Sequence, residues 1–148
     1  MPGTGDCIFC AIGAGGDALR TTSEDVVYRD ESTTAFVAAK WWPGNAGHVL
    51  VIPNCHARDV YEIPDNDLGA VYRTAKGVAA AIRLSYGCEG TSMFQHNEPG
   101  GGQDVFHFHV HVFPRWTDDR LYERTGEARW TTPEERAPYV ARLREALG

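Results

Sequence analysis

Three histidines alternate with apolar residues in one short segment of the chain. His107, His109 and His111 stand at every second position of DVFHFHVHVF, which follows the glycine-rich stretch NEPGGG. Side chains alternate between the two faces of a β-strand, so the three imidazoles are expected to share one face. The other face is then formed by Phe106, Phe108, Val110 and Val112. The segment predicts a strand over residues 104–113, with an apolar face that packs and a histidine face that does chemistry.

Three interpretations of this histidine row are open. The imidazoles can be ordinary surface groups, or the strand can be wholly metal-binding, since a His-x-His pair is a familiar zinc ligand set. The third interpretation is phosphorus chemistry, in which an imidazole attacks phosphorus and divides one hard displacement into two easier ones. Neighbouring imidazoles stabilise the added charge and move protons near neutral pH. The preceding stretch favours phosphorus chemistry, because Asn97 and Gln103 supply carboxamides and glycines such as Gly102 let backbone N–H groups approach a phosphate.

The cysteines point to a second kind of chemistry. Cys7 and Cys10 form a Cys-x-x-Cys pair near the start of the chain, and two more cysteines stand at positions 55 and 88. The start MPGTGDCIFC lacks a basic region followed by a hydrophobic stretch, so an export signal is not expected. In such a chain this spacing indicates a metal site or a redox pair more than a structural disulfide. The spacing alone leaves both alternatives open.

Composition limits the broad class of protein. The 148 residues suit one domain, and 43% hydrophobic with 23% charged residues is typical of a globular protein. No apolar run reaches the ~20 residues of a membrane span, so we expect a cytoplasmic protein with no membrane partner. The net charge of −6 argues against nucleic acid as a partner. An anionic ligand must therefore be held by a local site.

The elements around the histidines predict a mixed α and β order. Residues 24–30, 33–39 and 47–53 are typical of three strands in an antiparallel meander, and residues 90–97 are a fourth strand candidate. Apolar residues recur at three- and four-residue steps from Pro64 to Gly87, which indicates an amphipathic helix closed by Gly87. Thr132, followed three residues later by Glu135, is the signature of a capped helix start near the end of the chain.

Several motifs together carry a family resemblance. The segment HFHVHVF matches the histidine triad pattern His-φ-His-φ-His-φ-φ, and CIFC, GHVLVIPNCH and GGGQDVFHFHVHVFPR occur in the order found in bacterial HIT hydrolases. Over residues 7–115 the sequence resembles the histidine triad (HIT) superfamily. The resemblance implies one HIT domain over residues 1–148, with a core at 7–115 and a tail at 116–148 that contains a helix. It also implies an α+β fold with a five-stranded antiparallel sheet, one long helix and a C-terminal helix, paired as a homodimer.

The resemblance assigns roles to the histidine row. His109 would attack the α-phosphate of a nucleotide conjugate, and His111 would contact the phosphate and help handle the proton of the leaving group. Asn97 and Gln103 would hold phosphate oxygens or the bridging atom, with His48 as a supporting candidate. The implied set is catalytic His107, His109 and His111, with substrate-binding His48, Asn97, Gly102 and Gln103.

The resemblance also implies which residues would bind a metal together with the cysteine pair. Bacterial relatives with Cys-x-x-Cys bind a structural zinc, and the matching ligands here are Cys7, Cys10, His56 and His107. Two sulfurs and two nitrogens form a closed tetrahedral set, as expected of a structural zinc rather than a catalytic one. A reduced thiol pair without metal is the alternative. No organic cofactor is implied.

One departure from the family pattern concerns the sugar. Relatives usually read F-x-D-x-x-P before GH, with the Asp binding the ribose hydroxyls, whereas this chain reads AFVAAKWWPGNAGH and places Ala38 at the Asp position. Trp41 and Trp42 in the longer segment are expected to reshape the pocket, to pack in the core or to lie at a dimer interface. Asp104 stands where some relatives have Ser or Thr.

The resemblance therefore implies a hydrolase of nucleoside monophosphate conjugates, either phosphoramidates or dinucleoside polyphosphates. Two alternatives remain beside it. A nucleotidyl transferase is disfavoured because that branch typically has Gln at the third triad position, where this chain has His111. A nucleotide-binding regulatory protein with incidental hydrolysis is the other alternative.

Overall fold

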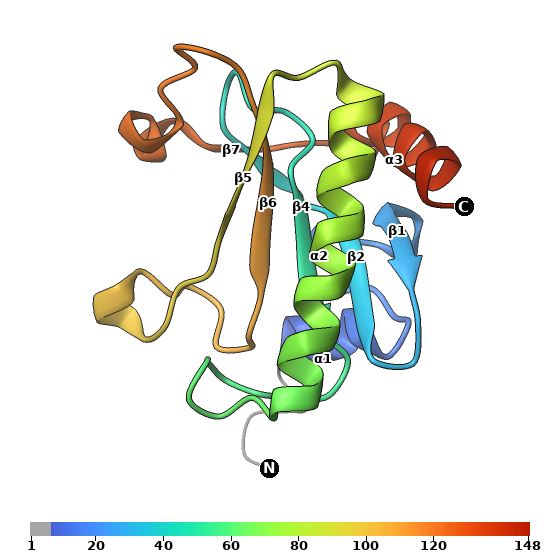
Figure 1. The fold of residues 1–148 in the computed structure, drawn as a ribbon, viewed down its shortest axis with the longest axis vertical. Helices are drawn as coiled ribbons and strands as arrows, with labels where there is room; N and C mark the ends of the chain where they lie inside the picture. The colour runs from blue at the N-terminus through green and yellow to red at the C-terminus, as the bar shows by residue number, and fades with distance from the viewer. Residues whose placement is uncertain (1–6) are drawn as a thin grey trace.

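The structure, a computed structural model, describes residues 7–148 and has an antiparallel five-stranded sheet at its centre (Figure 1). The strand order is β1-β2-β4-β6-β5. The strands are β1 (Val26–Arg29), β2 (Thr33–Val37), β4 (Val49–Pro53), β5 (Gly90–Phe94) and β6 (Val110–Arg115). The meander predicted from the first three strands is confirmed, because β2 pairs with both β1 and β4.

The two faces of the sheet have different roles. On one face, α2 (Asp65–Tyr86) packs along the strands, and α3 (Pro133–Leu147) lies beside it (Figure 1). Alternate residues of the three central strands fill this core, namely Ala35, Val37, Val49, Val51, Val110 and Val112. The residues between them point to the opposite face, where the short helix α1 (Ile8–Gly13) packs. His109 and His111 belong to this second face, so the histidines lie away from the main core.

The long helix α2 follows from its sequence. Its buried residues recur at helical spacing, Asp65 and Asp67 lie in its first turn, and Arg83 lies in its last. Gly87 closes it with a left-handed φ of 65°, a conformation that costs a glycine little. The predicted helix is confirmed. None of the helices within residues 7–148 combines the length and apolarity needed to cross a membrane.

The C-terminal helix α3 is tied to the start of the sheet by a buried ion pair. Thr132 and Glu135 form the predicted capping box at its N-terminus. Arg136, fully buried, donates from Nε to Oδ1 of Asp25 at 2.8 Å and from Nη2 to the carbonyl oxygen of Arg20 at 2.7 Å. The tail is therefore part of the folded domain and fixes the segment around Arg20.

A second, two-stranded sheet joins the tail to the segment after β2. Lys40 and Trp41 form β3 (Lys40–Trp41), which pairs with β7 (Arg129–Trp130). The pairing continues beyond the strands, because Thr131 donates from both its backbone N–H and its hydroxyl to the carbonyl oxygen of Ala39. Trp41 is buried against Tyr139 of α3, so of the three roles expected for the tryptophan pair, Trp41 takes core packing.

The strand predicted over residues 104–113 is wrong in its bounds. The observed β6 begins only at Val110, so His107 and His109 precede the strand. The backbone N–H of Phe108 donates to the carbonyl oxygen of Ala57 at 2.7 Å, which draws this segment away from β5. Phe108 is buried as expected, but Phe106 is 48% exposed and does not join the apolar face. The fourth strand is likewise shorter than predicted and ends at Phe94.

Candidate functional site

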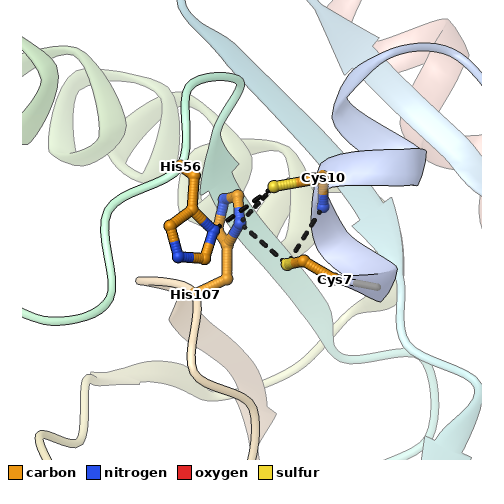
Figure 2. Close-up of side chains that lie close together, drawn as sticks. All are labelled: Cys7, Cys10, His56 and His107. Atoms are coloured by element: carbon orange, nitrogen blue, oxygen red, sulfur yellow. Dashed lines mark hydrogen bonds between the residues drawn. The ribbon is translucent and has the colours of Figure 1, made fainter. Parts of the chain in front are cut away.

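The first triad histidine belongs to a cluster of two thiols and two imidazoles. Cys7 and Cys10 come from the start of α1, His56 from the loop after β4, and His107 from the segment before β6 (Figure 2). Sγ of Cys7 lies 3.3 Å from Nδ1 of His107, and Sγ of Cys10 lies 3.3 Å from Nδ1 of His56. The four ligand atoms all lie within 4.8 Å of one another. The predicted ligand set is thus brought together from three separate segments.

The geometry of this cluster fits a tetrahedral zinc ion. Zinc bonds of about 2.0–2.3 Å place neighbouring ligand atoms of a tetrahedron roughly 3.3–3.8 Å apart, which matches the observed sulfur to nitrogen distances. Nε2 of His107 lies 2.9 Å from the carbonyl oxygen of Pro53, which can only accept, so the ring proton is on Nε2 and Nδ1 faces the sulfurs. Such a second hydrogen bond is what orients a metal-bound histidine. The zinc predicted from the sequence is consistent with every one of these contacts.

His109 presents one nitrogen for chemistry. Its Nδ1 lies 2.8 Å from the carbonyl oxygen of His107, so Nδ1 carries the proton and donates it. The second nitrogen, Nε2, is left for another partner and lies 3.5 Å from Oδ1 of Asp104. The ring of Phe9 packs edge-on against the imidazole with 5.1 Å between ring centroids. The backbone and α1 thus fix both the tautomer and the orientation of His109.

His111 and His48 lie in an aromatic stack beside His109. The His48 ring stacks on Phe113 with centroids 4.1 Å apart, and the ring of His111 stacks on Phe94 at 4.7 Å. Burial lowers the pKa of His48 to about 3 and, with the charge of His109 as a smaller cause, holds the pKa of His111 well below its usual range. Both imidazoles are therefore neutral at pH 7.

A cavity opens beside these histidines on the α1 face of the sheet. Its volume is about 680 Å³ including its open mouth. His48, His109 and His111 line it together with Asp104, and its apolar walls come from α1, β2 and β4, with Phe9, Ile12, Phe36, Ala38 and Leu50. Phe36, Leu50 and His111 are direct neighbours across three strands. The cavity thus has apolar walls and a polar end at His109. This arrangement suits a ligand that has a flat apolar part and a phosphate.

Three nitrogen atoms around this cavity lack hydrogen-bond partners. They are Nε1 of Trp42, Nδ1 of His48 and Nδ1 of His111, and all three are buried with no partner among residues 7–148. Buried polar atoms of this kind are nearly always satisfied in folded proteins. Three of the four such side-chain atoms within residues 7–148 belong to residues that line this cavity, which makes it the leading candidate for the functional site.

The remaining predicted substrate-binding residues, Asn97, Gly102 and Gln103, do not line the cavity. Oδ1 of Asn97 accepts from the backbone of Val60 at 2.8 Å, and Nε2 of Gln103 donates to the carbonyl oxygen of Arg58 at 2.6 Å. The N–H of Gly102 donates to Pro99 within its own turn. These side chains and this N–H hold the loops on either side together, and none of the three residues lines the His109 cavity. Their contact with substrate stays a prediction.

Among the cavity residues that were not identified as site residues from the sequence, four carry charge or an indole. Asp104 meets His109, and Arg20, Lys40 and Trp130 line the same cavity. Asp104 lies two residues after the last glycine of NEPGGG, and this proximity was a usable signal. Trp130 lies in the tail and reaches the cavity only because β7 pairs with β3, which no local pattern indicates.

Comparison with known proteins agrees with this geometry. The chain is 35% identical over 111 residues to "Protein hit" of Bacillus subtilis, covering 75% of this chain and 72% of that protein. A zinc-bound histidine triad family protein from Mycobacterium smegmatis superposes with a TM-score of 0.78 at 29% identity, covering 98% and 95% of the two chains. A hypothetical histidine triad nucleotide-binding protein from Sulfolobus tokodaii also gives 0.78, at 25% identity, covering 95% and 91%.

The family assignment rests on a direct match as well. Residues 20–118, which include β1 to β6 and the whole histidine row, match the HIT domain. The structure has the α+β architecture of that family and its Cys₂His₂ cluster is of the kind that holds zinc. The chain belongs to the HIT domain family.

Proposed function

We propose that this protein hydrolyses nucleotide conjugates at the α-phosphate through a nucleotidyl intermediate on His109. The observation that carries the proposal is the pair of contacts on the His109 ring. Nδ1 is committed to the carbonyl oxygen of His107, and Nε2 is directed to the end of an apolar cavity. An imidazole that is held in one orientation and presents one nitrogen to the cavity is what nucleophilic attack on phosphorus requires.

The proposed reaction has two steps. In the first, the lone pair of His109 Nε2 forms a bond to the α-phosphorus, and the bond from phosphorus to the leaving group breaks as the leaving group takes up a proton from solvent. In the second, water attacks the same phosphorus, the bond to Nε2 breaks and the water proton is released to solvent. The products are a nucleoside monophosphate, the leaving group and free His109. Because His111 is neutral, its single N–H serves as a hydrogen-bond donor to a phosphate oxygen.

Zinc has a separate role in this proposal. His107 faces the thiols while the carbonyl oxygen of the same residue accepts from His109. A zinc ion held by the four ligands would supply folding energy and would fix the backbone at His107. The residue thereby links the metal cluster to the orientation of the nucleophile. Its direct part in catalysis stays a prediction, as do the pairing of two copies and the cytoplasmic location.

The experiment is hydrolysis against a panel with three kinds of leaving group. Adenosine 5′-phosphoramidate, diadenosine tetraphosphate and a nucleotide sugar should be compared for kcat/KM in the natural protein and in His109→Ala. We expect at least one substrate to be cleaved, and the variant to lose turnover by about 10³-fold or more while it still binds AMP. Denaturation without acid during turnover should trap an adenylyl group on His109. Full activity in His109→Ala contradicts the mechanism.

A further inference from the structure

Two cations and an indole line the same cavity as His109. The guanidinium of Arg20 lies over the Trp130 ring, 4.7 Å from its centroid, and the ammonium group of Lys40 lies 5.5 Å from the same centroid. All three residues line the cavity that His109 and His111 also line. We refer to Arg20, Lys40 and Trp130 as the cationic rim.

Strand pairing and backbone hydrogen bonds hold the residues of this rim in place. Lys40 and Trp130 are paired residues of β3 and β7. Arg20 lies between Ala18 and Thr21, which form an isolated bridge, and its carbonyl oxygen accepts from the buried Arg136. The charged ends of two long side chains thus start from fixed backbone positions. Because the backbone is already fixed, a ligand would have to order only the side chains and not the segments that carry them.

Within residues 7–148, the charges of the rim are not used in ion pairs. Neither Arg20 nor Lys40 forms an ion pair with any residue of the described part of the chain, whereas five other arginines there do. The protein has a net charge of −6, so acidic partners are abundant. Among the described residues, the one acidic side chain on the cavity wall is that of Asp104, which lies at His109. The cavity therefore has an unneutralised positive region of its own.

We propose that the cationic rim binds a second phosphate, carried on the ribose of the nucleotide at its 2′ or 3′ position. This inference rests on the proposed function, in which His109 faces the 5′-phosphate. Nucleobases carry no negative charge at neutral pH, so a second anion on the nucleoside must be on the sugar. Arg and Lys are the usual phosphate ligands, and in dinucleotide-binding folds an arginine near the ribose accommodates a 2′-phosphate.

The cavity wall between His109 and the cationic rim supports the placement of the second phosphate on the ribose. Ala38, which directly follows β2, lines the cavity as Phe36 does two residues earlier and Lys40 does two residues later. A methyl group at Ala38 presents neither a hydrogen-bond acceptor for sugar hydroxyls nor a negative charge against a phosphate. Asp104, by contrast, lies beside the reacting nitrogen of His109, so a further phosphate attached directly to the α-phosphate would meet a negative charge. A polyphosphate leaving group is thus the less suitable source of the second anion.

Binding of four commercially available nucleotides tests the proposal. AMP, adenosine 3′,5′-bisphosphate, adenosine 2′,5′-bisphosphate and ADP should be titrated calorimetrically into the full-length, zinc-loaded protein at fixed salt. We expect at least one ribose bisphosphate to bind about tenfold or more tightly than AMP, since charge-assisted hydrogen bonds to phosphate are among the stronger ones. ADP, whose second phosphate lies on the leaving-group side, should show a smaller gain.

Variants assign the gain to the rim. Lys40→Gln and Arg20→Gln should each reduce the ratio of bisphosphate affinity to AMP affinity by about threefold to tenfold. Lys76→Gln and Arg83→Gln are the matched controls, because both are exposed cations on α2 outside the cavity wall and should leave the ratio unchanged. If the gain came only from long-range attraction to positive charge on the protein, all four variants would change the affinity ratio by similar amounts.

The outcomes separate this inference from the proposed function. If AMP neither binds nor is released from any conjugate, the proposed function itself is contradicted. If AMP binds but the ribose bisphosphates bind no better, the rim proposal is overturned and the proposed function stands. A gain that survives in both rim variants, or that ADP shows equally, also overturns the proposal, because the second phosphate is then bound elsewhere.

Discussion

Oδ1 of Asp104 lies 3.5 Å from Nε2 of His109, the nitrogen that the proposed reaction uses. The contact with the His109 imidazole lowers the pKa of Asp104 to about 2, against the opposing effect of burial. The carboxylate is therefore ionised at any pH at which the protein is assayed. A phosphate that approaches His109 must come close to this negative charge or displace it.

Asp104→Asn should consequently strengthen the binding of AMP. Two unit charges about 4 Å apart interact by ~1 kcal/mol in a water-like medium, which applies here because the side chain is 78% exposed. The expected decrease in Kd is roughly fivefold at low salt, and it should shrink at 1 M salt as the charges are screened. Asp118→Asn, exposed and outside the cavity wall, is the control. Unchanged or weaker AMP binding in Asp104→Asn would show that the carboxylate assists binding.

Zinc content and stability should change together in Cys7→Ser. The purified protein is expected to contain about one zinc per chain, and the variant should lose it together with several kcal/mol of stability, since a structural metal contributes folding energy directly. For a chain of this length the loss is on the order of 10 °C in Tm. Cys88→Ser removes a thiol outside the cluster and should keep the metal. Elemental analysis that finds no zinc in protein prepared without chelator contradicts the assignment.

Much of the site could be predicted because its signals are local or shared with a family. The alternation of the histidine row, the Cys-x-x-Cys pair and the family match together give the ligands His56 and His107, which the structure brings within reach of both thiols. The periodicity of α2 and the Thr132 capping box also predict their helices correctly. These features depend on neighbours in sequence or on a long shared pattern.

The remaining features depend on contacts that no local pattern encodes. β7 has two residues, too few for any periodicity, and its position is set by pairing with Lys40 and Trp41. The late start of β6 follows from the bond between Phe108 and the distant Ala57. The rim around Trp130 combines residues from both ends of the chain. None of these three features can be predicted without knowing which segments of the chain contact one another.

The ion pair between Arg136 and Asp25 should be essential for stability. Both side chains are almost fully buried, so Arg136→Met would leave the Asp25 carboxylate in the interior without its partner. Removing one member of such a pair costs about 3–5 kcal/mol of unfolding free energy. Arg144→Met, on the same helix but with an exposed side chain, should cost less than about 1 kcal/mol. Chemical denaturation of the two variants compares them, and equal small losses would mean that the buried pair contributes little.

Acid should destabilise the protein partly through His48. Its pKa of about 3 in the folded protein lies below its ordinary value of 6.5, so the unfolded chain takes up a proton first as the pH falls. The contribution of this group is fully present above pH 6.5 and is lost progressively towards pH 3, by at most about 1.4 kcal/mol per pH unit. His48→Phe keeps the stack on Phe113 but cannot be protonated. The difference in Tm between the variant and the natural protein should therefore shift in favour of the variant between pH 6.5 and 4.

The difference in Tm between His48→Phe and the natural protein is the quantity to compare. The zinc ligands also take up protons in this pH range, but they do so in both proteins. Two curves of Tm against pH that run parallel would show that His48 is not the group concerned. A variant that is less stable at every pH by the same amount would report a packing defect only.

Ala38→Asp tests how the cavity treats the sugar. Ala38 is buried in the wall of the cavity, its N–H donates to the carbonyl oxygen of His48, and its own carbonyl oxygen accepts from Trp41, so its position is fixed. With a methyl group there, adenylate conjugates of ribose and 2′-deoxyribose should be cleaved with similar kcat/KM, because an apolar wall discriminates weakly against a missing hydroxyl.

A carboxylate at this position can accept from the ribose hydroxyls, and a site that hydrogen-bonds a hydroxyl discriminates steeply against its absence. Ala38→Asp should therefore favour the ribose conjugate by about tenfold or more, and it should weaken any ribose bisphosphate because the new charge repels the second phosphate. The kcat/KM ratio for the two sugars measures the first effect, and titration with adenosine 3′,5′-bisphosphate measures the second. A strong preference for ribose in the natural protein would mean that another group on the wall, with Lys40 and Trp42 as the nearest polar candidates along the chain, already binds the hydroxyls.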